Sequence, residues 1–224
     1  MCIRDRAWPE PVRFQSQETD TYQTALDALA RAGLIYPCCC NRADIAQAAA
    51  APQEGVPEFG PDGRIYPGTC RHRSLSQARP GDALRLDMRK AVKALQKPLT
   101  YEEFGEQHSE RITLKAEALI AQVGDVVLRR KDQGAAYHLA VVIDDDAQNI
   151  TDVVRGADLN AATQIHVVLQ QLLNIPTPRY HHHSLIRDET GKRLAKRSDS
   201  EALSSLRKAG HSAQDITERL FSAP

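Results

Sequence analysis

Cysteine is the residue type in this chain whose spacing points most directly to chemistry. Three cysteines are adjacent in "YPCCC" (36–40), and a further one, Cys70, lies in "RIYPGTCRHR". In an extended segment or tight turn, alternate residues fall on one side, so we expect Cys38 and Cys40 to converge while Cys39 points away. Cys70 can supply a third thiolate, and the set predicts a metal site.

The residues alone leave the fourth ligand open. His72 is the commoner chemical type, whereas Tyr66 needs its phenol deprotonated by the metal itself. A competing interpretation treats the adjacent cysteines as small buried hydrophobes and Cys70 as unrelated to them. A single C-x-C is a much weaker signal than paired C-x-x-C knuckles, so spacing does not decide between the two.

The composition is that of an ordinary globular protein. The chain has 224 residues, 42% of them apolar, and 29 lysines and arginines balance 29 aspartates and glutamates, so no global basic field indicates a nucleic-acid partner. No apolar run is long enough to span a bilayer, and "MCIRDRAWPEP" lacks the apolar core of a signal peptide. We expect a cytoplasmic protein with no membrane partner. Thiols stay reduced there, and an odd cysteine count favours a metal over disulfides.

A second cluster lies in "YHHHSLIRDETGKRLAKRS" (180–198), which combines three consecutive histidines with five basic residues from 187 to 197. Such a loop offers cations to phosphate oxygens, and Lys196 is the type of point charge that can follow a phosphate through a transition state. The alternative is a solvated charged loop. Histidines on a strand alternate faces, so at most two of the three can converge.

Two further groups have both a functional and a structural interpretation. Tyr137 and Arg155 each lie beside a predicted strand, where an arginine can clamp a carboxylate or pair with an internal aspartate. Asp144, Asp145 and Asp146 offer oxygens to a divalent cation, but we interpret them as an acidic turn exposed to water.

Apolar spacing predicts the elements that position these groups. We expect amphipathic helices over 20–32 and through 165–172, the latter stopped by the prolines of "NIPTPRY". Short β-branched runs predict strands at "DVVLRR" (125–130), "LAVVID" (139–144) and "ITDVVRG" (150–156), with a hairpin turn at "DDDAQN". Two short helical patterns close the chain, the last opening at Ser212 with Asp215 three residues on. "PQEGVPEFGPDG" (52–63) is expected to be a loop held at its base.

Taken in order, these motifs resemble the glutamyl-Q tRNA(Asp) synthetases, truncated relatives of glutamyl-tRNA synthetase. The series "FQSQETDTY", "YPCCCNRADI", "IYPGTCR", "AYHLAVVIDDDAQNITDVVRGADL" and "YHHHSLIRDETGKRLAK" carries the resemblance from about Trp8 to about Lys208. It implies an α/β fold: the Rossmann-type catalytic core of a class I synthetase with a small zinc-binding insertion. It also implies activation of L-glutamate with ATP without tRNA, followed by transfer to the queuosine of tRNA(Asp).

The resemblance also assigns roles to individual residues. Cys38, Cys40, Tyr66 and Cys70 match the family's ligands for one structural zinc ion, so Tyr66 is preferred to His72. Tyr137 and Arg155 match residues that contact glutamate. The loop "RLAKR" (193–197) matches the second class I signature, in which Lys196 acts catalytically. Lys196, Arg193 and His182 are the expected ATP-binding residues, and ATP is expected with Mg2+. Ala195 stands where serine is frequent, and the role of His182 beside this loop is open.

The resemblance is weakest at the front, where nothing in "MCIRDRAWPEP" matches the family's first βα unit with its HIGH-type phosphate-binding loop. We therefore expect an incomplete core that is inactive alone. The expected division is a non-native leader over 1–7, the rest of the N-terminal Rossmann portion over 8–36, a zinc-binding, acceptor-type insertion over 37–120, and a C-terminal Rossmann half over 121–224. We expect a monomer. The alternative hypotheses are a non-catalytic zinc-containing RNA-binding module and the truncated core of a true glutamyl-tRNA synthetase.

Overall fold

The computed structural model describes residues 11–49, 58–105, 109–130, 134–187, 191 and 203–221. The chain divides into two compact units, of which Arg13–His183 is one, and Met1–Val12 with Ser184–Pro224 is the other. None of the helices in the described ranges is long and apolar enough to cross a membrane.

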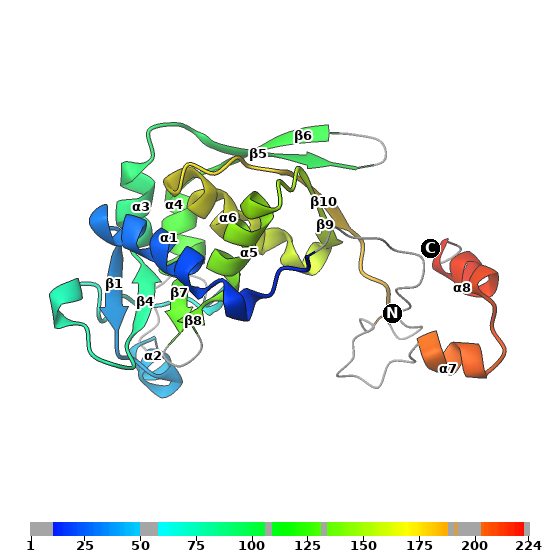
Figure 1. Ribbon diagram of the computed structural model, residues 1–224, viewed down its shortest axis with the longest axis horizontal. Coiled ribbons are helices and arrows are strands. Elements are labelled where there is room, and N and C mark those ends of the chain that lie inside the picture. Colours follow the sequence, from blue (N-terminus) through cyan, green and yellow to red (C-terminus); the bar gives the residue numbers. More distant parts are fainter. Residues whose placement is uncertain are drawn as a thin grey trace. The chain divides into compact units, whose positions relative to one another are not determined.

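Two four-stranded sheets form the frame of the larger unit (Figure 1). The first has the order β1 (Ile35–Cys38), β4 (Ala83–Leu86), β7 (Val127–Arg130), β8 (Gly134–Ala135), with antiparallel neighbours throughout. The second has the order β6 (Ser109–Leu114), β5 (Leu99–Phe104), β10 (Arg179–His183), β9 (Asp152–Gly156); β10 runs parallel to both β5 and β9. A two-stranded hairpin pairs β2 (Phe59–Gly60) with β3 (Gly63–Arg64) inside the expected loop.

Helices fill the space between these sheets. In Figure 1, α1 (Thr19–Arg31), α5 (Tyr137–Ala147) and α6 (Asn160–Leu172) lie between the first sheet and the long β5–β6 hairpin. The helix expected over 20–32 is confirmed as α1, and its buried residues are those of the predicted apolar face: Tyr22, Ala25, Leu26 and Leu29. The helix expected through 165–172 is confirmed as α6, which joins the parallel strands β9 and β10 as a βαβ unit.

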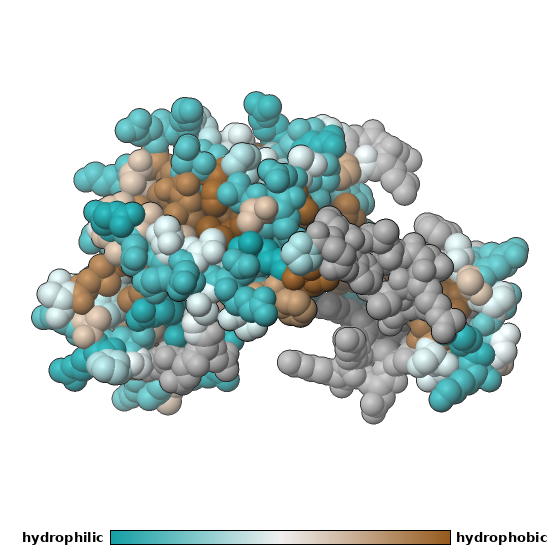
Figure 2. Space-filling view, viewed as in Figure 1, coloured by the Kyte–Doolittle hydropathy of each residue, from teal (hydrophilic) through white to brown (hydrophobic). Residues whose placement is uncertain are grey.

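The remaining elements are short. They comprise α2 (Arg42–Ala48), α3 (Met88–Ala94), α4 (Ala116–Ala118), 3-10 turns at Gln15–Gln17, Leu75–Gln77 and Ala157–Leu159, and a π turn at Leu119–Val123. Figure 2 shows that hydrophilic side chains cover most of the face in view, with apolar colour showing between them over the central helices. The second unit contains α7 (Leu203–Lys208) and α8 (Ala213–Phe221). As expected, Ser212 and Asp215 cap α8 reciprocally, backbone to side chain, at 2.7 and 3.1 Å.

The prediction of a strand at "LAVVID" is wrong, and so is the prediction of a hairpin between it and "ITDVVRG". Residues 137–147 form helix α5, whereas 152–156 form β9 as expected. A short β-branched run does not by itself separate a strand from a buried helix. Here α1 and α6 pack against α5, and this tertiary burial outweighs the strand propensity of two valines and an isoleucine. The helix ends at Ala147; just beyond it Asn149 has a φ of 54°, and the Ile150 N–H bonds back to the Asp145 carbonyl at 2.9 Å.

The expected exposed turn at Asp144–Asp146 is also wrong, because these residues lie within α5. Asp144 is 7% exposed. Its carboxylate accepts hydrogen bonds from Arg13 Nε (2.9 Å), Gln15 Nε2 (2.8 Å) and Tyr22 Oη (2.8 Å). Asp144 therefore fastens α5 to α1 and to the segment before it, and its oxygens are already committed to protein donors.

Candidate functional site

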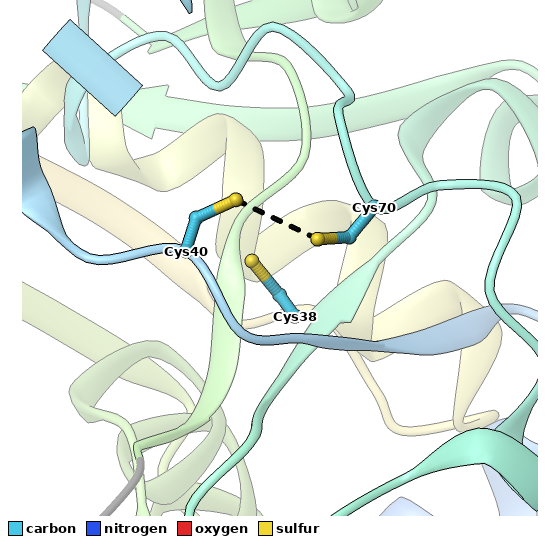
Figure 3. Close-up of side chains that lie close together, drawn as sticks. All are labelled: Cys38, Cys40 and Cys70. Atoms are coloured by element: carbon cyan, nitrogen blue, oxygen red, sulfur yellow. Dashed lines mark hydrogen bonds between the residues drawn. The ribbon is translucent and has the colours of Figure 1, made fainter. Parts of the chain in front are cut away.

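The end of β1 and the turn after β3 bring the predicted sulfur ligands together. Cys38, Cys40 and Cys70 place their Sγ atoms within 4.8 Å of one another, and Figure 3 shows the three sulfurs facing a common point. The Cys40 and Cys70 sulfurs are 3.5 Å apart. Tyr66 Oη lies 3.4 Å from the sulfurs of both Cys38 and Cys40. The cluster therefore consists of three sulfurs and one phenol oxygen.

These separations fit a zinc ion. With Zn–S bonds of about 2.3 Å and a Zn–O bond of about 2.0–2.2 Å, a tetrahedron has ligand–ligand edges of roughly 3.5–3.8 Å. The two sulfur–oxygen distances of 3.4 Å and the Cys40–Cys70 sulfur distance of 3.5 Å lie at or just below that range. Cys38 is fully buried, and Tyr66 and Cys70 are 3% and 4% exposed, as befits a closed structural site. His72 is exposed and is not among the clustered residues.

The prediction that Cys39 points away from the other cysteines is only partly confirmed. Its side chain is exposed, yet its Sγ lies 3.7 Å from that of Cys70, so the sulfur does not turn away from the cluster. Burial alone raises the pKa of the Cys70 thiol, but hydrogen bonds from Tyr66 and the neighbouring cysteines outweigh burial and lower it to about 6. A thiol with this pKa is largely a thiolate at neutral pH, the form in which cysteine binds metal.

The surroundings of Tyr66 favour its oxygen as an acceptor. The Cys70 backbone N–H donates to Tyr66 Oη at 2.9 Å, and the Arg85 guanidinium lies over the Tyr66 ring at 4.0 Å from its centroid. Burial raises the pKa of Tyr66 above its ordinary value, so a bound cation is needed to displace the phenolic proton.

One buried carboxylate ties this cluster to the sheet. Asp125 accepts hydrogen bonds from Tyr36 Oη (2.6 Å), Arg71 Nε (2.8 Å) and the Met88 backbone N–H (2.9 Å). Tyr36 is on β1, two residues before Cys38, and Arg71 follows Cys70 in sequence. Both ligand-bearing segments are therefore held from a common anchor.

A second group of side chains gathers around Arg155, at the end of β9. The register of β9 and β10 pairs Arg155 with His182, and Arg155 Nε donates to His182 Nε2 at 3.1 Å. From the first turns of α6, Thr163 Oγ1 accepts from Arg155 Nη2 at 2.7 Å, and His166 Nδ1 lies 3.3 Å from Nη1. A guanidinium has five N–H donors and no acceptor, so these contacts use three donors and leave two.

Within the described residues, Arg155 forms no ion pair with a carboxylate, so the internal partner considered from the sequence is absent there. Tyr137, the other residue expected at the amino-acid site, is the first residue of α5 and is 46% exposed. Its ring meets those of His138 and His166 edge-on, at centroid distances of 5.3 and 5.9 Å. The structure thus brings Tyr137 and Arg155 onto one shared histidine, His166.

His182, expected near ATP, lies in this second group. Its side chain is 2% exposed, and its Nδ1 lies 2.8 Å from Glu103 Oε2 on β5. His181, one position earlier, is 2.5 Å from the Phe104 carbonyl oxygen through its Nδ1. Arg193 and Lys196 lie outside the described residues, so their predicted contacts with ATP stay predictions.

Several members of this group carried no recognised sequence signal. Glu103, Thr163 and His166 were not singled out, and neither was His138. The one available signal was His166, a polar residue inside the apolar run "IHVVL" (165–169) on the buried face of a predicted helix. A buried polar side chain needs a partner, and such an interruption marks one.

Comparison with known proteins identifies the family. The family model for the catalytic domain of class I tRNA synthetases (E and Q) matches residues 5–221. The chain belongs to this family. A glutamyl-Q tRNA(Asp) synthetase of Rhodobacter capsulatus is 50% identical over 212 residues, covering 93% of this chain and 74% of the relative. One from Albidiferax ferrireducens is 39% identical over 206 residues, covering 87% of this chain and 65% of the relative.

A solved structure supports the same fold. A glutamate tRNA ligase from Elizabethkingia meningosepticum, in complex with its amino acid, matches 93% of this chain and 39% of its own, with a TM-score of 0.57 and 20% identity. The expected α/β fold of a class I synthetase catalytic domain is confirmed, with mixed sheets, and so is the resemblance to glutamyl-Q tRNA(Asp) synthetases. The chain spans 74% of the length of the first relative and 65% of the length of the second. The expected domain boundaries stay predictions.

Proposed function

We propose that this chain carries out the glutamate-binding part of a glutamyl-Q tRNA(Asp) synthetase reaction. In that reaction the glutamate α-carboxylate attacks the α-phosphate of ATP and pyrophosphate leaves; the glutamyl group of the resulting glutamyl-AMP then passes to the queuosine of tRNA(Asp), and AMP leaves. The names of the relatives support the reaction class, because the R. capsulatus protein is 50% identical to this chain.

One observation in the structure carries the amino-acid assignment. Arg155 is held by three contacts with neutral acceptors, retains two N–H donors, and has no carboxylate partner in the described ranges. A half-buried guanidinium in this state is suited to bind a carboxylate through two parallel hydrogen bonds. Tyr137 has an exposed side chain and packs against His166, which Arg155 also contacts, so Tyr137 and Arg155 can bind one small acidic ligand together.

The charge that develops on the α-phosphate needs cations beyond Arg155. We propose Lys196 and Arg193 for this role, because they fall in the loop that resembles the second class I signature. An ATP contact by His182 stays a prediction from the resemblance, whereas its bonds to Arg155 and Glu103 favour a role in holding Arg155.

For the sulfur cluster we propose one structural zinc ion held by Cys38, Cys40, Tyr66 and Cys70. The bound ion would tie β1 to the turn that follows β3, and a closed four-ligand site leaves no position for substrate. The zinc ion is therefore assigned to stability of this region.

Transfer of labelled glutamate to tRNA distinguishes this function from that of a true glutamyl-tRNA synthetase. The chain should be tested as given and with the N-terminal segment of the R. capsulatus relative placed before Trp8. We expect label on queuosine-containing tRNA(Asp), and none on tRNA(Asp) lacking queuosine or on tRNA(Glu). Charging of tRNA(Glu) alone would favour the synthetase core, and tRNA binding without any transfer would favour an RNA-binding module.

A further inference from the structure

Two buried histidines lie behind the proposed amino-acid site. His166 on α6 is 2% exposed and His138 on α5 is 6% exposed, and their rings approach through His166 Nε2 and His138 Nδ1 at 3.1 Å. His138 Nε2 in turn lies 3.3 Å from Asp62 Oδ1, in the turn between β2 and β3. Arg155, His166, His138 and Asp62 thus form a continuous chain of side-chain contacts.

The donors of Arg155 fix the direction of every bond in this chain. A guanidinium can only donate, so His166 Nδ1 must accept from Arg155 Nη1, and the His166 proton must sit on Nε2. That proton faces His138 Nδ1, which must therefore accept it and leave the His138 proton on Nε2. This last proton faces the Asp62 carboxylate, a suitable final acceptor.

Protonation of His166 would disrupt this arrangement of hydrogen bonds, because both ring nitrogens would then be donors and Nδ1 could no longer accept from Arg155. Burial lowers the pKa of His166, the neighbouring His138, Arg155 and His182 side chains lower it further, and the result is about 3. The ring is accordingly neutral at physiological pH. Its neutral form matches the geometry, which requires one acceptor and one donor.

The same two rings also support Tyr137. They meet its ring edge-on at interplanar angles of 66° and 64°, the arrangement in which aromatic edges and faces attract. His166 thus touches both residues proposed to contact glutamate, and His138 touches Tyr137 and orients His166.

We infer that His166 and His138 are positioning residues of the amino-acid site. They hold the Arg155 guanidinium and the Tyr137 ring in one arrangement through a directional hydrogen-bond chain that ends at Asp62. The identity of the ligand as glutamate rests on the proposed function, whereas the hydrogen-bond chain does not. Asp62 belongs to the hairpin that precedes Tyr66. The hydrogen-bond chain therefore also connects the amino-acid site with the region of the sulfur cluster.

The hydrogen-bond chain can be tested on this protein without any activity. Imidazole nitrogen shifts from 15N-histidine NMR near neutral pH, assigned with His166→Gln and His138→Gln, should show both rings neutral and protonated on Nε2. The signal of the Arg155 Nη1 protons, which face His166, should persist in His166→Gln, whose amide can both accept and donate, and should broaden or vanish in His166→Leu. A charged His166, a proton on its Nδ1, or an unchanged Arg155 signal in His166→Leu would overturn the inference.

A kinetic measurement tests whether the hydrogen-bond chain supports glutamate binding. In glutamate-dependent ATP–pyrophosphate exchange by the N-terminally extended protein, His166→Leu should raise the KM for glutamate roughly tenfold and leave the KM for ATP nearly unchanged. His166→Gln should stay within about threefold of the parent, as should the exposed control His211→Gln. Equal increases in both KM values for His166→Leu would indicate a merely structural role and overturn the inference. Absence of exchange in the parent would instead refute the proposed function, and the NMR result would still decide the hydrogen-bond chain.

Discussion

A buried neutral histidine makes stability depend on pH, and His166→Gln isolates that dependence. The pKa of His166 is about 3 in the folded protein, against 6.5 for an unperturbed histidine. Below pH 6.5 the imidazole of His166 binds a proton in the unfolded protein but not in the folded protein, so the free energy of unfolding falls as the pH falls. This loss begins near the unfolded pKa and continues down to the folded one.

The size of the effect follows from the two pKa values. Between about pH 7.5 and about pH 5, protonation of the unfolded histidine lowers the free energy of unfolding by about 2 kcal/mol. Glutamine cannot take up the proton and can keep both hydrogen bonds. The parent should therefore lose about 2 kcal/mol more than His166→Gln over this range.

Other groups titrate in the same range, which is why the comparison with the variant is needed. Burial, helped by Asp144, raises the pKa of Asp145 to about 6, and this carboxyl stabilises the folded state as the pH falls. Asp145 and the cysteines contribute to parent and variant alike and cancel in the difference. Urea unfolding of both proteins at the two pH values measures that difference. An equal loss of unfolding free energy in the parent and in His166→Gln would refute the claim that His166 is neutral and buried, on which the hydrogen-bond chain depends.

Three further predictions concern the sulfur cluster, the amino-acid site and the core. Elemental analysis should find about one zinc per chain, lost in Cys70→Ser but retained in Cys39→Ser and His72→Ala; retention in Cys70→Ser would refute the ligand set. In the extended protein, Arg155→Lys should raise the KM for glutamate at least tenfold with little change in the KM for ATP, since lysine lacks the planar pair of donors; equal damage to both would assign Arg155 to the fold. Asp144→Asn should lower the free energy of unfolding by about 3 kcal/mol in urea titrations, because a buried carboxylate with three donors is lost, and a change under about 0.5 kcal/mol would contradict that assignment.

Local spacing was sufficient to predict the parts of the structure that depend on near neighbours. The apolar face of α1 and the stop after α6 follow from residues within one or two turns, and both are confirmed. The C-x-C spacing made the meeting of Cys38, Cys40 and Cys70 one of two interpretations, and the family resemblance was needed to choose it; the structure brings the three sulfurs together.

Tertiary packing decided what the sequence did not reveal. Residues 139–144 have strand propensity, yet flanking helices make them part of α5, and the same packing buries Asp144. Arg155 and His182 become neighbours only through the register of β9 and β10. No local pattern contains that register, so the partners of Arg155 could not be predicted before the sheet was known.

Glutamate-dependent ATP–pyrophosphate exchange in the absence of tRNA tests the central claim most directly. It should be measured on this chain and on the chain extended before Trp8, with aspartate and glutamine as control amino acids. We expect exchange in the extended protein with glutamate alone, severely reduced by Lys196→Ala, and no detectable exchange in the unextended chain. An extended protein that binds tRNA but shows no exchange with glutamate would contradict the assignment as a glutamate-activating synthetase.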